Sequence, residues 1–149
     1  MLDLRNKRIV VTGGSGFIGT AVVAKLQERV CRKIIVPRSR YYDLTISGAV
    51  AALFVKYKPQ VVIHLAGRSA GLAANIARPA EFFYDNLMMG ANMIHQAHIY
   101  GVEKFVAVGT AGAYPENPPS IPFREEELWD GYPEKALGPY CLAKKMLVV

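Results

Sequence analysis

The chain has 149 residues, of which 52% are hydrophobic and 20% charged, a balance that excludes wholesale disorder and allows one domain with its own core. No apolar run approaches a membrane span, and the charged segment from Met1 to Arg8 is unlike a signal peptide. The formal net charge of +6 comes from scattered basic residues, which disfavours a nucleic-acid binder and suits a phosphorylated cofactor and an anionic substrate. Cys31 and Cys141 show no metal spacing, so we expect free thiols, no metal site and a cytoplasmic protein.

A strand is predicted over residues 8–12, followed by a glycine-rich turn and a helix over 17–29. The turn has the spacing Gly13-x-x-Gly16-x-x-Gly19. Gly13 allows the backbone angles of the turn, Gly16 leaves room for a pyrophosphate, and Gly19 lets the helix lie close to the sheet. The helix start offers free N–H groups and a positive dipole end to an anion. We therefore predict a dinucleotide site that includes Gly13, Gly16, Phe17, Ile18 and Gly19. The predicted apolar face of the helix consists of Phe17, Ile18, Val22, Val23 and Leu26.

A second short strand is predicted over residues 33–36, and Arg38-Ser39-Arg40 follows it. In a dinucleotide fold the end of this strand meets the adenosine ribose, where a carboxylate would bind the 2′-hydroxyl. Residues 33–42 contain no carboxylate, and the two guanidinium groups and the hydroxyl of Ser39 suit a 2′-phosphate. This favours NADP over NAD, with a solvated basic loop as the alternative. The predicted cofactor residues in this stretch are Arg38, Arg40, Asp43 and Leu44.

Thr45 is predicted to cap a helix that ends near Tyr57 and turns Val50, Leu53, Phe54 and Tyr57 inward. The apolar run over residues 61–66 indicates a buried parallel strand, in which His64 is interpreted as a core residue rather than a catalytic one. A loop of small residues over 67–79 follows at the end of that strand, where cofactor and substrate would lie. Leu65, Ala66 and Gly67 are predicted to contact the cofactor.

The longest predicted helix covers residues 80–100. Its predicted inner face consists of Phe83, Leu87, Ala91, Ile94 and His98, and His95 and His98 are interpreted as structural. A fourth strand over 104–109 completes an alternation that predicts a Rossmann-like, doubly wound α/β fold, with a parallel sheet between two layers of helices. The proline-rich stretch over 112–139 is predicted to be mostly loop, with a solvated acidic patch over 125–127, before Pro139 starts a last helix.

Tyr140-Cys141-Leu142-Ala143-Lys144 is a Tyr-x-x-x-Lys motif that places two functional groups one helical turn apart. Together with the glycine turn, it resembles the extended short-chain dehydrogenase/reductase superfamily of NAD-dependent epimerases and dehydratases. A closer resemblance, to the GDP-L-fucose synthase family of GDP-4-keto-6-deoxymannose epimerase/reductases, extends from about Ile9 to Lys145. It is carried by the segments 84–89, 94–97, 114–115 and 123–128.

The resemblance implies hydride transfer to or from a sugar carbon, with Tyr140 as the acid/base. Lys144 would favour the phenolate and bind the nicotinamide ribose, and Thr110 would orient the reacting oxygen. It also implies a GDP-linked nucleotide sugar as substrate. It further implies a homodimer in which the helix over residues 80–100 and the helix of Tyr140 pair with their counterparts in a second subunit. Apolar residues for such a second helix face are Met88, Met89, Met93 and Ile99.

Two departures from the family are visible. Gly112 stands where the family carries a cysteine that serves as an acid/base in epimerisation. The family also continues past the Tyr-x-x-x-Lys helix into a substrate domain, which we expect to be absent from these 149 residues. The alternative hypothesis is therefore a Rossmann module that binds the cofactor without turnover.

Overall fold

The structure is a computed structural model that describes residues 3–148. Its internal contacts divide the chain into two compact units. Unit 1 consists of Met1–Gly67 and Met88–Val108, and unit 2 consists of Arg68–Leu87 and Gly109–Val149. Among the described residues, no helix combines the length and the apolar character needed to cross a bilayer.

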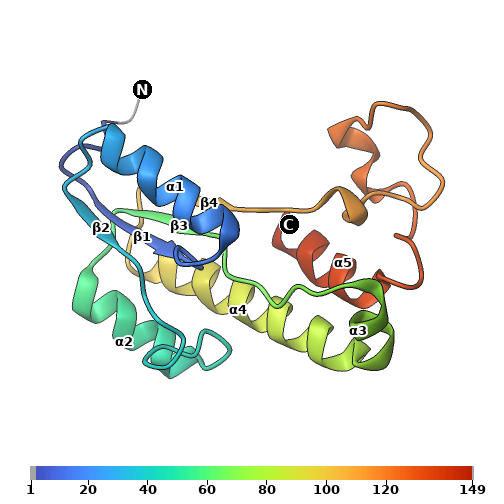
Figure 1. Ribbon diagram of the computed structural model, residues 1–149, viewed down its shortest axis with the longest axis horizontal. Coiled ribbons are helices and arrows are strands. Elements are labelled where there is room, and N and C mark those ends of the chain that lie inside the picture. Colours follow the sequence, from blue (N-terminus) through green and yellow to red (C-terminus); the bar gives the residue numbers. More distant parts are fainter. Residues whose placement is uncertain (1–2, 149) are drawn as a thin grey trace. The chain divides into compact units, whose positions relative to one another are not determined.

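Unit 1 is built on a parallel sheet of four strands in the order β2-β1-β3-β4 (Figure 1). The strands are β1 (Arg8–Thr12), β2 (Lys33–Ile35), β3 (Val61–His64) and β4 (Lys104–Ala107). The register places Val10 of β1 opposite Ile35 of β2 and Val62 of β3. Strand order reverses at β1, so the carboxyl ends of β1 and β3 form a switch point of the kind where α/β sheets bind ligands. The predicted parallel α/β sheet is thus confirmed.

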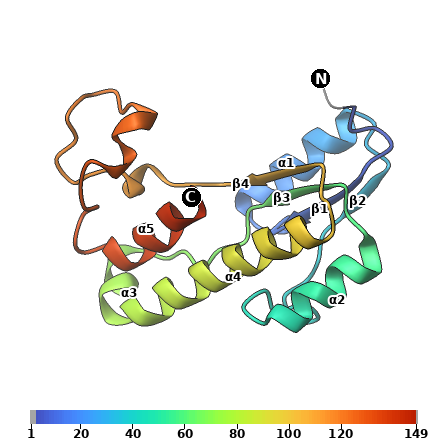
Figure 2. The same ribbon diagram turned by 180° about the vertical axis from the view of Figure 1, so that it is seen from behind.

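Helices cover both faces of this sheet (Figure 2). α1 (Phe17–Glu28) lies on one face, where Leu26 packs with Ile9 and Val11 of β1. On the other face lie α2 (Ser47–Tyr57) and the later part of α4 (Pro79–Ile99). The core there consists of Val10, Val50, Leu53, Phe54, Val62 and Met93, all fully buried. Neighbouring strand residues therefore face opposite helix layers, as a doubly wound fold requires.

Two helix faces differ from the prediction. Phe17 is 97% exposed and Ile18 is 56% exposed, because the tight glycine turn brings the start of α1 to the sheet through Gly19 instead. In α4 the buried face lies one residue earlier than predicted, at Phe82, Asn86, Met93 and Ala97. A shift of one residue rotates a helical face by about 100°. Met93, predicted for a second apolar face, therefore lies in the core.

The start of α2 also corrects the prediction. Thr45 does not cap the helix, whose first residue is Ser47 after Ile46. Instead the Thr45 hydroxyl and N–H both donate to Asp43 Oδ1, at 2.7 and 2.9 Å. Thr45 thus closes a local turn in the segment that leads into the helix.

Unit 2 holds the segments on which sequence patterns gave the least guidance. The predicted loop over 67–79 contains α3 (Leu72–Ala77), in which the buried Asn75 amide donates to Ala70 O and Gly71 O. The first part of α4 also belongs to this unit. Asparagine side chains that bond nearby backbone favour such short turns.

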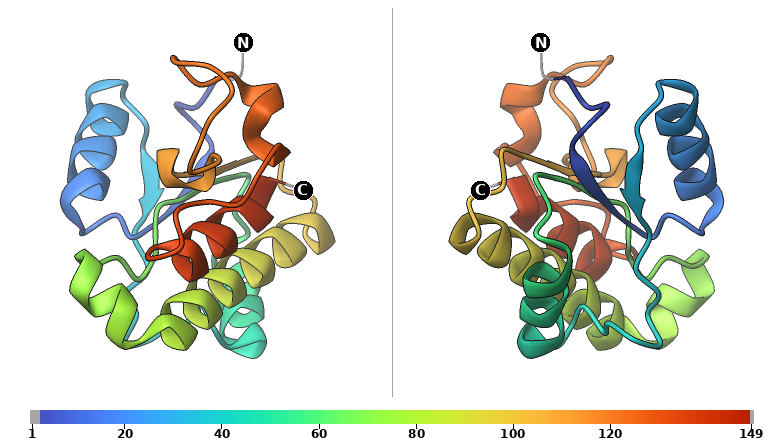
Figure 3. Two further views of the ribbon diagram at one scale, coloured as in Figure 1. Left: turned by 90° about the vertical axis from the view of Figure 1, so that its right-hand side faces the viewer. Right: turned by 90° about the vertical axis from the view of Figure 1, so that its left-hand side faces the viewer.

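The second segment of unit 2 is largely irregular, as predicted (Figure 3). It contains the 3-10 turns η1 (Ala111–Ala113), η2 (Glu125–Trp129) and η3 (Met146–Val148), and the helix α5 (Gly138–Lys145), which has Pro139 in its first turn. The predicted solvated acidic patch is wrong at Glu127, which is buried. Its two carboxylate oxygens lie 2.7 and 2.8 Å from the Ser120 hydroxyl and share that group's one proton.

Candidate functional site

The glycine turn of unit 1 is closed so tightly that side chains do not fit. Gly13 has φ = +67°, and a Cβ there would lie 2.8 Å from the backbone nitrogen of Ala66. A Cβ at Gly19 would collide with the carbonyl oxygen of Gly13. The turn therefore presents bare backbone at the N-terminus of α1, and the first turn of that helix holds no acidic residue. Such a cradle suits an anionic diphosphate.

A buried polar contact joins the strand ends below the turn. The Ala66 N–H donates to Thr12 Oγ1 at 3.2 Å, and Thr12 Oγ1 lies 2.7 Å from His64 Nδ1. Thr12 and His64 are each 1% exposed, so this contact is shielded from water. It fixes the end of β1 against the end of β3, and it accounts for His64 as a core residue.

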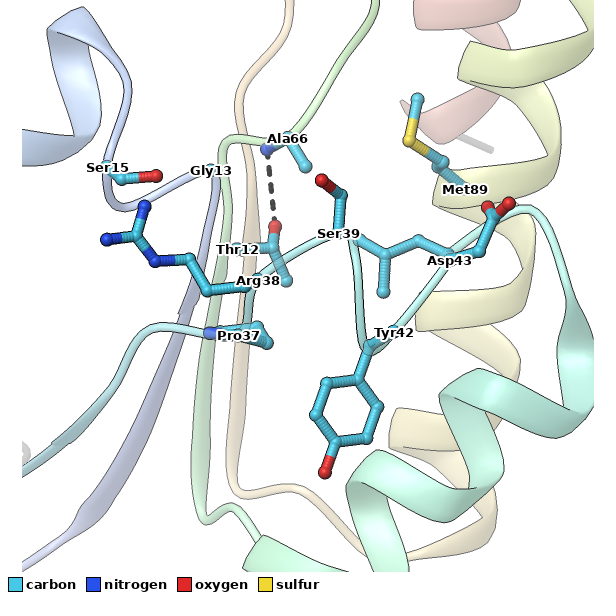
Figure 4. A pocket seen from close by; sticks show the side chains of 11 residues that line it. Thr12, Gly13, Ser15, Pro37, Arg38, Ser39, Tyr42, Asp43, Ala66 and Met89 are labelled. Carbon is cyan, nitrogen blue, oxygen red and sulfur yellow. Dashed lines mark hydrogen bonds between the residues drawn. The ribbon is translucent and has the colours of Figure 1, made fainter.

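A cavity of about 220 Å³ opens beside the turn, at the carboxyl ends of β1 and β3 (Figure 4). Five predicted cofactor residues line it: Gly13, Arg38, Asp43, Leu44 and Ala66. The other lining residues are Thr12, Ser15, Pro37, Ser39, Tyr42 and Met89. Of these, only the Ser39 hydroxyl was expected near a phosphate. Ser15 carried a usable signal, since it lies inside the glycine motif.

The two arginines after β2 have different surroundings. Arg38 lines the cavity, and its guanidinium extends toward Ser15 on the glycine turn (Figure 4). Arg40 lies outside that lining, with its guanidinium carbon 4.6 Å from the ring centroid of Tyr41. Of the two arginines predicted to bind phosphate, only Arg38 is thus in the cavity lining, together with the hydroxyl-bearing Ser15 and Ser39.

Hydrogen bonds fix the far wall of the cavity. The two bonds from Thr45 lower the pKa of Asp43, so this carboxylate stays ionised and tied to its own turn. The Asn92 amide of α4 donates to Leu44 O at 3.0 Å and to Thr45 O at 3.1 Å. Leu44 is a buried apolar residue in the cavity lining, so it gives this wall an apolar surface. The wall is held in place by Asn92, which is distant from it in sequence.

The other predicted cofactor residues of unit 1 lie around the cavity rather than in its lining. Gly16, Phe17, Ile18 and Gly19 form the end of the turn and the start of α1. Leu65 and Gly67 flank Ala66 just after β3, and the Leu65 N–H donates to Thr12 O at 3.2 Å.

Unit 2 carries the Tyr-x-x-x-Lys motif on α5. Tyr140 and Lys144 are one turn apart, and Lys144 is only 5% exposed. Burial lowers the pKa of Lys144. Burial is also the largest influence on Tyr140 and raises the pKa of its phenol, with a smaller contribution in the same direction from Cys141. A hydrogen bond with the Ser69 side chain acts against this rise.

A second cavity, of about 390 Å³, lies within unit 2. Its lining includes Thr110, Tyr114, Glu125 and Lys144, so two residues of the predicted catalytic set share it. The Gly112 N–H donates to Thr110 Oγ1 at 3.3 Å, which caps η1. Thr110 thereby has a structural contact as well as a position in the cavity wall.

Gly112 is closely covered by a thiol. A Cβ at Gly112 would lie 2.9 Å from Sγ of Cys141, a side chain that is 1% exposed. Burial raises the pKa of Cys141, and the charge of Glu134 raises it further. Cys31 and Cys141 are both free, as predicted, and both are buried. The space that a side chain at position 112 would need is therefore taken by the neutral thiol of Cys141.

Comparisons with known proteins find similar proteins over almost the whole chain. Residues 9–148 match the family described as NAD dependent epimerase/dehydratase. The sequence is 38% identical to GDP-L-fucose synthase of Sinorhizobium fredii over 144 residues, which cover 97% of this chain and 45% of that protein. A solved structure of a GDP-mannoheptose C4 reductase from Campylobacter jejuni with NADP bound is 36% identical, with a TM-score of 0.90 over 96% of this chain and 45% of that one.

A GDP-L-fucose synthetase from Naegleria fowleri bound to NADP is 32% identical, with a TM-score of 0.86 over 96% of this chain and 46% of that one. The chain thus spans about half the length of the relatives that it matches.

Proposed function

The chain belongs to the NAD-dependent epimerase/dehydratase family, and from this we propose that it binds NADP(H) and takes part in reducing the keto group of a GDP-linked sugar. The observation that carries the proposal is the cavity beside the glycine turn, which Arg38 and Ser15 both line. NADP-bound relatives that share the fold at 36% and 32% identity support the choice of cofactor. GDP-sugar names among the relatives support the substrate class.

The residues of unit 1 fit the phosphorylated half of such a cofactor. The bare backbone at Gly13, Gly16 and Gly19 would receive the diphosphate. Arg38 would hold the 2′-phosphate by charge-assisted bonds, with hydroxyls of Ser15 and Ser39 close by. The adenine would lie on the apolar wall that includes Leu44.

Unit 2 would supply the proton. NADPH held in this way would supply the hydride that the carbonyl carbon takes up. Tyr140 would give its phenolic proton to the carbonyl oxygen, which yields an alcohol and leaves a phenolate. Burial raises the pKa of Tyr140, so the phenol is protonated at neutral pH, as the reductive direction requires. Lys144 would stabilise the phenolate and bind the nicotinamide ribose, and Thr110 would orient the substrate oxygen.

We further propose reduction without epimerisation. Inverting a carbon next to a carbonyl needs a group that removes a proton and one that returns it. Gly112 has no such group, and the thiol that covers it is buried with a raised pKa. A buried neutral thiol is a poor base.

The test combines calorimetry with product analysis. We expect the purified chain to bind NADPH, and Tyr140→Phe to keep that binding. With GDP-4-keto-6-deoxymannose, we expect loss of NADPH absorbance and a product reduced at the keto carbon with its neighbouring centres unchanged by NMR. Tyr140→Phe should reduce this turnover roughly a hundredfold or more, the range of general acid catalysis.

Three outcomes would correct the proposal. NADPH binding without turnover would indicate a cofactor-binding module, the alternative that the partial length raises. An inverted product would refute reduction without epimerisation. A chain that binds neither NADPH nor NADH would refute the cofactor site itself.

A further inference from the structure

A buried lysine next to the Tyr-x-x-x-Lys motif has no part in the proposed chemistry. Lys145 follows Lys144 on α5 and is 3% exposed. Successive residues of a helix point about 100° apart, so the two lysines meet different neighbours. Lys144 lines the cavity of unit 2, and Lys145 does not. Burying an ammonium group is costly, so Lys145 needs polar or aromatic contacts of its own.

Lys145 contacts the end of η2 and the segment that follows it. The ammonium group donates to Gly131 O at 3.0 Å and lies 4.8 Å from the ring centroid of Trp129. Among the described residues, no carboxylate forms an ion pair with Lys145. This buried cation is thus held by two neutral groups, a carbonyl oxygen and an indole ring. One side chain of α5 therefore binds two residues of a neighbouring segment.

The segment after η2 is closely packed on its other sides as well. The Glu116 N–H donates to Tyr132 O at 2.9 Å. A Cβ at Gly131 would lie 3.0 Å from Cβ of Pro115, and a Cβ at Gly138 would lie 3.2 Å from the Tyr132 hydroxyl oxygen. Residues 131–132 thus contact both residues 115–116 and the start of α5, and the bond from the ammonium group closes the remaining contact to the end of that helix.

η2 connects this contact to the cavity of unit 2. Glu125 and Leu128 belong to η2 and line the cavity, as do Thr110 and Lys144. Trp129 directly follows Leu128 and lies outside the lining. A movement of the Trp129 ring would therefore be passed to a cavity wall that stands opposite the predicted catalytic residues.

We infer that Lys145 is a positioning residue, which holds the η2 wall of this cavity through Trp129 and Gly131. A fixed wall keeps the cavity in the shape that the sugar of a GDP-linked substrate requires. An apolar side chain at position 145 would leave the Gly131 carbonyl without this donor and the indole ring without its cation. The inference rests on the proposed function, which places the substrate oxygen beside Thr110.

The first test is a selective loss of substrate affinity. Lys145→Met keeps the length of the side chain and removes its cation and its donors. We expect this variant to bind GDP-mannose, a GDP-linked sugar without a keto group, roughly tenfold more weakly in calorimetry. NADPH binding should be unchanged, because the cavity that Arg38 lines belongs to unit 1. Lys145→Arg, which keeps a cation and donors, should restore the affinity, and Lys135→Met, at an exposed lysine of unit 2, is the matched control.

The second test reads the contact without any ligand. Trp129 is the only tryptophan in the sequence and is 53% exposed, so the intrinsic fluorescence reports on this ring alone. We expect acrylamide to quench that fluorescence more strongly in Lys145→Met than in the wild type. Lys145→Arg should return the quenching to the wild-type level, and Lys135→Met should not change it. Equal quenching in Lys145→Met and the wild type would show that Lys145 does not hold the ring.

Trp129→Ala tests the same contact from the other side, and it also serves if Lys145→Met does not fold. It should weaken GDP-mannose binding by a similar factor, and the double variant should bind no more weakly than either single variant. Wild-type affinity in the variants would overturn the role of Lys145 and leave the proposed function intact. A wild-type chain that binds NADPH but not GDP-mannose would overturn the proposed substrate class, and the role of Lys145 with it.

Discussion

The close approach of Cys141 to Gly112 determines whether Gly112→Ala stabilises or destabilises the protein. We predict that the sign of this stability change reverses when Cys141 is replaced by alanine. Gly112 is not among the positive-φ glycines, which within the described residues are Gly13 and Gly101, so its backbone accepts alanine. The new methyl carbon would, however, lie 2.9 Å from the buried Cys141 Sγ. Cβ atoms do not approach a neighbour this closely, so the thiol or η1 must move.

The magnitude follows from two opposing effects. Overpacking a filled site costs about 1–3 kcal/mol. Replacing glycine with alanine at a compatible site returns about 0.4–1 kcal/mol, because the unfolded chain has less freedom to lose. Gly112→Ala should therefore destabilise the protein by roughly 0.5–2 kcal/mol. With Cys141→Ala in place the obstacle is gone, and the same substitution should stabilise by about 0.4–1 kcal/mol.

The assay is a double-mutant cycle by urea unfolding, monitored by circular dichroism. Gly48→Ala is the matched control, since a Cβ there meets nothing within 4 Å, and it should stabilise in both backgrounds. Equal effects of Gly112→Ala with and without Cys141, within about 0.5 kcal/mol, would refute the steric reasoning. The cycle also constrains engineering: a cysteine introduced at position 112 should need Cys141→Ala beside it before it can gain epimerase activity.

Three further predictions concern the cavity and α5. Arg38→Ala should weaken NADP binding by about tenfold or more in calorimetry while NAD binding changes little, and Arg40→Ala should leave both nearly unchanged, because Arg40 lies on Tyr41. Thr12→Val removes a buried partner of the Ala66 N–H and should lower the urea unfolding free energy by roughly 1–3 kcal/mol. Burial lowers the pKa of Lys144, so its cost to stability is fully present at pH values below that lowered pKa. The cost fades as pH rises from the lowered pKa toward the pKa of a free lysine, and it is gone above the latter. Lys144→Met should therefore raise Tm at pH 7, with a gain that shrinks in alkaline buffer.

Patterns in the sequence predicted the sheet because its strands are short, continuous apolar runs. They did not predict α3, because six residues are too few to show a helical period and Gly71 before it has no side chain to cap it. The inner face of α4 was wrong because apolar residues occupy adjacent stripes, and the buried one includes the polar Asn86. That choice depends on the bonds of Asn86 to the Arg68 backbone, a contact that helical periodicity does not encode.

The candidate site divides in the same way. The glycine turn was predictable because each glycine answers a local steric need. The different positions of Arg38 and Arg40 were not predictable, because they depend on a turn between the two residues and the tyrosines that follow. In this turn the N–H groups of Tyr41 and Tyr42 both donate to Arg38 O, at 3.0 Å each. This turn carries Arg40 out of the cavity lining.

The central position of β1 in the sheet affects which wall of the cavity can open locally. Its residues Val10 and Thr12 are almost completely buried, and they pair with β3 at the point where the Ala66 N–H bonds Thr12. We expect amides of this strand to exchange with solvent only when the whole unit unfolds, whereas residues 37–43 lie outside any strand or helix and should open locally. More of the entropy lost on ligand binding should therefore be lost in the Arg38 segment than at the strand ends that the bond between Ala66 and Thr12 joins.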